Sequence, residues 1–131
     1  MGPKYLMDSN VIIDYLGNKL PAKSNAIIDS LPIVISVITR MEIVGLYNGS
    51  QQQIKKLVSF CDKAMIYSIT EEIILQTINI RQKYKIKLPD AIIAATALVF
   101  ELTLITHNIA DFKKIKGLKP TDSYTLKSIS I

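Results

Sequence analysis

Short apolar runs alternate with longer amphipathic stretches along this 131-residue chain. Four of the runs have the length and the aliphatic content of strands, and polar residues bound each of them. The sequence predicts strands over residues 4–7, 33–37, 65–67 and 103–106, and the tail after residue 119 could hold a last short one. The run at 33–37 is almost uniformly β-branched, which is typical of a strand buried on both faces in a parallel sheet.

Between these runs, apolar residues recur at helical spacing. We expect helices over residues 11–16, 24–31, 39–48, 50–63, 68–84 and 88–100, and a loop or short helical turn over 107–112. Asp8 or Ser9 would cap the first helix, and two capping boxes, Thr39 to Glu42 and Ser68 to Glu71, would begin two others. Strands that alternate with helices predict a mostly parallel sheet with helices on both faces. The length predicts one domain over residues 1–131.

Composition narrows the class of protein. Apolar residues make up 49% of the chain, which is enough for a core, but no run reaches the roughly 20 residues of a membrane span. The N-terminus lacks a signal-peptide pattern, so we expect a cytoplasmic protein. One cysteine, Cys61, and one histidine, His107, exclude an internal disulfide and a usual zinc site. The net charge of +5 favours nucleic acid as a partner, although a lysine-rich soluble surface explains it equally.

Four acids stand where the predicted sheet has its carboxyl edge. Asp8 follows the first strand, Glu42 lies in the first turn of the helix after the second, Asp90 opens the apolar helix, and Asp111 follows the fourth strand. Each acid alone is explained as well by helix capping, by the helix dipole or by an ordinary loop. Ligands of open α/β sheets collect at this edge, so we expect the four side chains to be neighbours.

Clustered carboxylates repel one another and need cations or raised pKa values. Their hard oxygen ligands suit Mg²⁺ or Mn²⁺, which can activate water against a phosphodiester while lysines hold the nucleic-acid backbone. Other chemistries lack their motifs, because the chain has no P-loop, no G-x-G-x-x-G and no G-x-S-x-G. The residues therefore predict a metal-dependent nucleic-acid hydrolase.

Four segments, residues 6–14, 42–46, 88–97 and 104–112, together resemble the PIN-domain nucleases and, within them, the VapC-type toxins of toxin–antitoxin pairs. The resemblance implies a three-layer α/β/α fold with a five-stranded, mostly parallel sheet. It also implies a Mg²⁺- or Mn²⁺-dependent endoribonuclease that uses activated water, forms a homodimer and pairs with an antitoxin.

The resemblance also assigns roles to single residues. Asp8, Glu42, Asp90 and Asp111 are implied to be both catalytic residues and metal ligands. Asn10 and Thr106 are implied to support the metal site by hydrogen bonding, and Asn108 competes with Asp111 for the fourth position. Ser9 stands where relatives commonly carry Thr, and His107 stands where they often carry Arg.

Two other functions remain open from the sequence. One is a housekeeping PIN nuclease that acts in RNA processing or DNA repair, and the other is a non-catalytic RNA-binding PIN module. The presence of all four acids favours an enzyme over the binding module. The apolar positions Ile73, Ile74 and Ile78 could form a partner surface, and core packing explains them equally.

Overall fold

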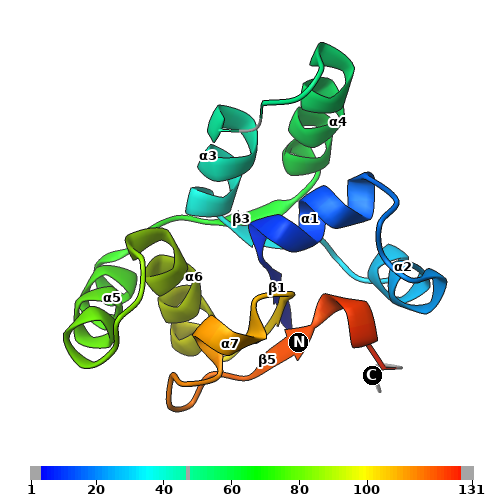
Figure 1. Cartoon of the computed structure of the whole chain (residues 1–131). Helices are drawn as coiled ribbons and strands as arrows, with labels where there is room; N and C mark the ends of the chain where they lie inside the picture. The colour runs from blue at the N-terminus through cyan, green and yellow to red at the C-terminus, as the bar shows by residue number, and fades with distance from the viewer. Residues whose placement is uncertain (1–3, 47, 128–131) are drawn as a thin grey trace.

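A computed structural model describes residues 4–46 and 48–127 of the chain (Figure 1). Five strands are present, at the predicted places and in the tail. They are β1 (Tyr5–Met7), β2 (Val34–Ser36), β3 (Met65–Tyr67), β4 (Thr103–Thr106) and β5 (Pro120–Asp122). The α-helices of the described residues are α1 (Ser9–Leu16), α2 (Ala22–Asp29), α3 (Val37–Leu46), α4 (Gln51–Asp62), α5 (Glu71–Lys83), α6 (Leu88–Val99) and α7 (Ile109–Phe112). A short 3₁₀ helix, η1 (Ser123–Thr125), follows β5.

The strands form two parallel groups instead of one five-stranded sheet. One group has the order β1-β4-β5 and the other pairs β2 with β3. All three pairings are parallel, as predicted. The single five-stranded sheet is wrong, because no ladder joins β1 to β2 within residues 4–46 and 48–127, although the two strands are in contact. Both strands are only three residues long, and after β1 the backbone N–H of Asp8 donates to the Ile105 carbonyl of β4, 3.0 Å away.

Helices cover both faces of the strands, as predicted. Successive strand residues point to opposite faces, so Leu6 packs with α5 and α6 while Met7 packs with α1 and α4. On β4, Leu104 and Ile105 divide between the two cores in the same way. Figure 1 shows α5 to α7 gathered on a different side of the strands from α1 and α4. Two hydrophobic cores therefore hold the strand ends in fixed positions.

The helix that follows β2 begins earlier than the sequence suggests. Val37 is already helical, and the side chain of Ser36 accepts a hydrogen bond from the Ile38 backbone N–H at 3.2 Å. Thr39 is therefore inside α3, and its buried hydroxyl has no hydrogen-bond partner in the described part of the chain. The predicted capping box from Thr39 to Glu42 is wrong, which leaves the Glu42 carboxylate available for other contacts.

Other helix ends depend on nearby polar side chains. Asp8 caps α1, as expected, by accepting from the Ser9 backbone N–H. Thr70, and not Ser68, caps α5, so the second predicted box is also wrong. A complete capping box that the sequence analysis did not identify, Ser50 with Gln53, begins α4. Within the described residues, no helix is long and apolar enough to cross a membrane.

Candidate active site

Three of the four predicted acids line one cavity of about 450 Å³. Its walls come from the start of α1, from α3 and the residues after it, from the first turn of α6 and from the loop after β4. They are formed by Asp8, Ser9, Asn10, Ile13, Glu42, Asn48, Asp90 and Asn108. A smaller cavity of about 240 Å³ between α1 and α4 has no acid in its walls, so we place the candidate chemistry in the first one.

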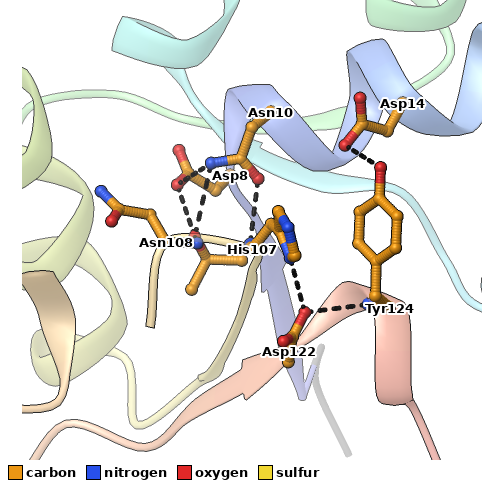
Figure 2. Close-up of polar contacts among 8 residues, drawn as sticks. Asp8, Asn10, Asp14, His107, Asn108, Asp122 and Tyr124 are labelled. Atoms are coloured by element: carbon orange, nitrogen blue, oxygen red, sulfur yellow. Dashed lines mark hydrogen bonds and ion pairs between the residues drawn. The ribbon is translucent and has the colours of Figure 1, made fainter. Parts of the chain in front are cut away.

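Asp8 is held by a set of hydrogen-bond donors (Figure 2). Its Oδ1 accepts from the Ser9 backbone N–H at 2.7 Å, and its Oδ2 accepts from Thr106 Oγ1 at 2.8 Å and from Asn10 Nδ2 at 3.0 Å. Only 4% of the residue is exposed. Burial raises the pKa of Asp8, the three donors oppose that rise, and the nearby charge of Glu42 adds to it. The fold thus fixes this carboxylate in one orientation at the end of β1.

Glu42 reaches the same cavity from α3. Its Oε1 accepts a hydrogen bond from Ser9 Oγ at 2.8 Å. Since Ser9 also donates its backbone N–H to Asp8, this one residue contacts two of the acids. The contact between Ser9 and Glu42 was not predicted from the sequence, although the position of Ser9 directly after Asp8 was a signal for it.

As predicted, Asp90 lies in the first turn of α6, and the structure shows that it is half-buried. The pKa of Asp90 is raised to about 6, first by burial and then by the charges of Asp8, Glu42 and Asp111, while Lys87 lowers it. The other three predicted acids therefore all lie within electrostatic reach of Asp90. The uncompensated repulsion is what a cation at this place would relieve.

The loop after β4 supplies the fourth side of the site. Thr106 Oγ1 accepts from the Asn108 backbone N–H at 3.0 Å, so the hydroxyl that contacts Asp8 also shapes this loop. Asn108 lines the cavity and donates through Nδ2 to Asp111 Oδ2 at 2.9 Å. Asp111, on the short helix α7, is exposed and is not part of the cavity wall. Asn108 is thus the inner and Asp111 the outer member of a bonded pair.

A second network, which sequence reasoning missed, adjoins the site (Figure 2). The Asn10 side chain accepts from the His107 backbone N–H at 3.1 Å, and His107 Nδ1 lies 2.9 Å from Asp122 Oδ1. Tyr124 packs against the His107 ring with centroids 4.1 Å apart, and its hydroxyl donates to Asp14 Oδ2 at 2.9 Å. Burial would raise the pKa of Asp122, but the hydrogen bonds from His107 and from the Tyr124 N–H outweigh it and lower the value.

The donor set fits a hard divalent cation. The polar side chains in the cavity wall offer carboxylate, amide and hydroxyl oxygens, which are the ligands that Mg²⁺ and Mn²⁺ accept. Within the described residues, no group of three or more acidic, histidine or cysteine side chains is placed so that it could hold a metal ion by itself. A cation here would therefore need waters or substrate oxygens as further ligands, as Mg²⁺ usually has beside one or two carboxylates.

Comparisons with known proteins point to one family. A family model described as "PIN domain" matches residues 5–118. Ribonuclease VapC1 of Haemophilus influenzae is 29% identical over 130 residues, which cover 90% of this chain and 96% of that protein. A toxin–antitoxin complex from Klebsiella pneumoniae contains a chain that is 32% identical, with a TM-score of 0.74 and coverage of 94% of this chain and 100% of that one.

A second solved structure has a similar fold. VapBC-1 from nontypeable Haemophilus influenzae contains a chain that is 28% identical to this one, with a TM-score of 0.76. The match covers 92% of this chain and 98% of that one. The likeness therefore extends over nearly the whole length of both chains.

Proposed function

Since this chain belongs to the PIN-domain family, we propose that it is a metal-dependent endoribonuclease and the toxin of a toxin–antitoxin pair. The observation that carries the enzymatic part is the convergence of Asp8, Glu42 and Asp90 on one cavity, where burial and the neighbouring charges raise the pKa of Asp90 to about 6. The likeness to a protein named a ribonuclease and to toxin–antitoxin complexes supports the substrate and the biological role.

Asp8 and Asp90 would hold Mg²⁺ or Mn²⁺ directly, while Glu42 and the Asn108–Asp111 pair complete its surroundings. When bound, the cation would polarise the scissile phosphate and make water a stronger nucleophile. The carboxylates supply the negative charge that attracts it. The repulsion among the four acids would then be relieved, so cation binding and the charge state of Asp90 are coupled.

The chain's own residues orient the reaction. Thr106 and Asn10 keep Asp8 in place by hydrogen bonding, and Ser9 holds Glu42 at 2.8 Å. From that position the Glu42 carboxylate can orient the attacking water and accept its proton, with Asp111 assisting from the outer side. Water attacks the phosphorus, the bond to the leaving oxygen breaks, and no covalent enzyme intermediate forms.

The partners follow from the same family membership. We propose that residues 1–131 act as one PIN domain in the cytoplasm, as a homodimer that a cognate antitoxin inhibits. Exposed apolar side chains on α5 support a partner surface there, since Ile74, Leu75 and Ile78 are 40%, 58% and 49% exposed. Ile73, which the sequence also offered for a partner surface, is fully buried in the core.

Brief induction in cells, followed by mapping of new RNA ends in total RNA, tests the proposal. Wild type should produce discrete new ends, and Asp8→Asn should produce none while it keeps the wild-type circular dichroism spectrum. Purified wild type should cleave single-stranded RNA with Mg²⁺ and stop when a chelator is added. Cleavage by Asp8→Asn at the wild-type rate would refute the assignment of the site.

The toxin role needs its own measurement. Induction of a toxin should arrest growth, and coexpression with the product of an adjacent small reading frame should restore it. A housekeeping nuclease would cleave RNA without arresting growth. A non-catalytic module would bind RNA and leave it intact under every metal condition.

A further inference from the structure

Seven exposed lysines lie in two short segments, 83–87 and 113–119, that are well separated in the chain. We call them together the lysine surface. It consists of Lys83, Lys85, Lys87, Lys113, Lys114, Lys116 and Lys119. The net charge of the chain is +5, so the remainder of the protein is net acidic and the positive charge is concentrated here.

Specific contacts join the two segments. Lys114 Nζ donates to the Lys85 carbonyl at 2.6 Å, and the Lys116 backbone N–H donates to the Tyr84 hydroxyl at 3.1 Å. Tyr84 and Leu118 both pack against the core formed by α5 and α6. The fold therefore holds lysines from distant parts of the sequence beside one another, at a cost in like-charge repulsion.

No acid of the described residues forms an ion pair with these lysines. Across residues 4–46 and 48–127, the single ion pair within 4.0 Å is the one between His107 and Asp122. The other lysines of the described residues also lie outside ion pairs, so what distinguishes the lysine surface is its concentration of positive charge, which suits an external polyanion.

The lysine surface begins beside the cavity and continues along α6. Lys87 immediately precedes α6, and its charge acts on Asp90 within the cavity wall. At the other end, a Cβ built on Gly117 would lie 3.5 Å from Leu98 Cδ2, near the C-terminus of the same helix. A helix of 12 residues is about 18 Å long, so the surface offers positive charge over more than one phosphate.

We propose that the lysine surface binds the phosphate backbone of single-stranded RNA and guides it into the cavity. The proposal rests on the endoribonuclease function proposed above and adds where the RNA lies outside the cleavage site. Lysine is a flexible point charge, so these contacts would hold the backbone without reading base sequence. Sequence preference would then have to come from the cavity and its rim.

A charge-matched pair of variants tests the proposal. One variant combines Lys85→Gln, Lys116→Gln and Lys119→Gln, which leaves Lys87 and the Lys114 anchor in place. The control combines Lys23→Gln, Lys55→Gln and Lys63→Gln, which lie on or directly after α2 and α4, the helices that pack with the other core. Both variants lower the net charge by the same amount. Binding of a fluorescent single-stranded RNA is measured against salt concentration in proteins that also carry Asp8→Asn, and cleavage is measured without it.

The proposal expects a difference between the two variants. Each lost phosphate contact should lower the slope of log affinity against log salt by about 0.7, so the lysine-surface variant should lose about 2 and the control much less. In cleavage assays its KM should rise while its kcat stays at the wild-type value. Equal losses in the two variants would overturn the proposal, as would a loss of antitoxin affinity with unchanged RNA binding. Failure of the wild type to cleave any RNA would instead refute the proposed function.

Discussion

The two carboxylates at the centre of the cavity are stabilised in opposite ways. Asp8, at the end of β1, is 4% exposed and accepts hydrogen bonds from Ser9, Asn10 and Thr106. Asp90, in the first turn of α6, is half-buried, and its carboxylate accepts no hydrogen bond from the described residues. Burial and repulsion by its neighbours raise the pKa of Asp90 to about 6.

The two carboxylates therefore differ in what they receive from the protein: Asp8 is positioned by hydrogen bonds, whereas the charge of Asp90 is poorly compensated. The donors around Asp8 satisfy that carboxylate within the protein, because each replaces a hydrogen bond that the group would otherwise make to water. Asp90 has only the amino end of α6 and the charge of Lys87 to favour its ionised form. The fold therefore positions the Asp8 carboxylate by hydrogen bonds, whereas the charge of Asp90 is the one that the proposed cation would compensate.

The largest expected effect is a loss of cleavage activity, and it should be similar for the two acids. Asp8→Asn and Asp90→Asn should each lower kcat/KM for single-stranded RNA by at least about 10³-fold, a loss of about 4 kcal/mol of transition-state stabilisation, since each removes a proposed ligand. The measurement is cleavage of a fluorescent RNA with saturating Mg²⁺. Asp62→Asn, which removes an exposed acid on α4, is the matched control and should keep wild-type activity. Activity in either site variant within about tenfold of wild type would remove that acid from the site.

Without metal, substitutions of the two acids should have opposite effects on the free energy of unfolding. Asp8→Ala removes the acceptor of the buried Thr106 hydroxyl and of the Ser9 backbone N–H, so it should lower the free energy of unfolding by about 1–3 kcal/mol. Asp90→Asn removes a repelled charge and breaks no hydrogen bond in the described part of the chain. After allowance for its half-exposed position, it should raise stability by about 1 kcal/mol. Urea unfolding with a chelator present measures both, and equal destabilisation by the two variants would contradict the comparison.

The pH dependence should come from Asp90. Its folded pKa of about 6 lies above the ordinary value of 3.8, so ionisation costs stability above pH 6, and the cost disappears as the pH falls towards 4. The stability gained by Asp90→Asn in the metal-free protein should therefore be largest near pH 7 and fade by about pH 4. Thermal unfolding of both proteins across this range is the measurement. A gain that grows as the pH falls would show that the pKa of Asp90 is lowered instead of raised.

Sequence patterns predicted most of the elements and acids that form this site, but fewer of the contacts between its residues. The strands and the four acids follow from local periodicity and from the rule that parallel strands end at one edge. The same local reasoning failed at Glu42, because a capping box and a site acid on the first helical turns give the same S/T-x-x-E spacing. Only the start of α3 at Val37 distinguishes them, because it places Thr39 inside the helix.

The hydrogen-bond network that joins His107, Asp122 and Tyr124, here called the Tyr124 network, could not be predicted from the sequence for a different reason. Asp122 reaches His107 because β5 pairs with β4 so that Thr106 lies opposite Asp122. Strand pairing at that distance has no local signature when the second strand is the three residues from Pro120 to Asp122. The contact from Tyr124 to Asp14 spans 110 residues and depends on that same register. The missing ladder between β1 and β2 is also a property of backbone geometry that residue types do not encode.

The smallest expected effect tests whether the Tyr124 network helps to position Asp8. Tyr124→Phe removes the hydroxyl that donates to Asp14 but keeps the ring against His107. It should lower the midpoint of thermal unfolding by about 2 °C and leave the response to Mg²⁺ unchanged, since the lost contact does not involve Asp8. The control is Tyr67→Phe, on β3, whose ring stacks on Phe100 away from the cavity. A large loss of cleavage in Tyr124→Phe alone would mean that the network holds Asp8 in place. The residues that position Asp8 would then include Tyr124 on η1.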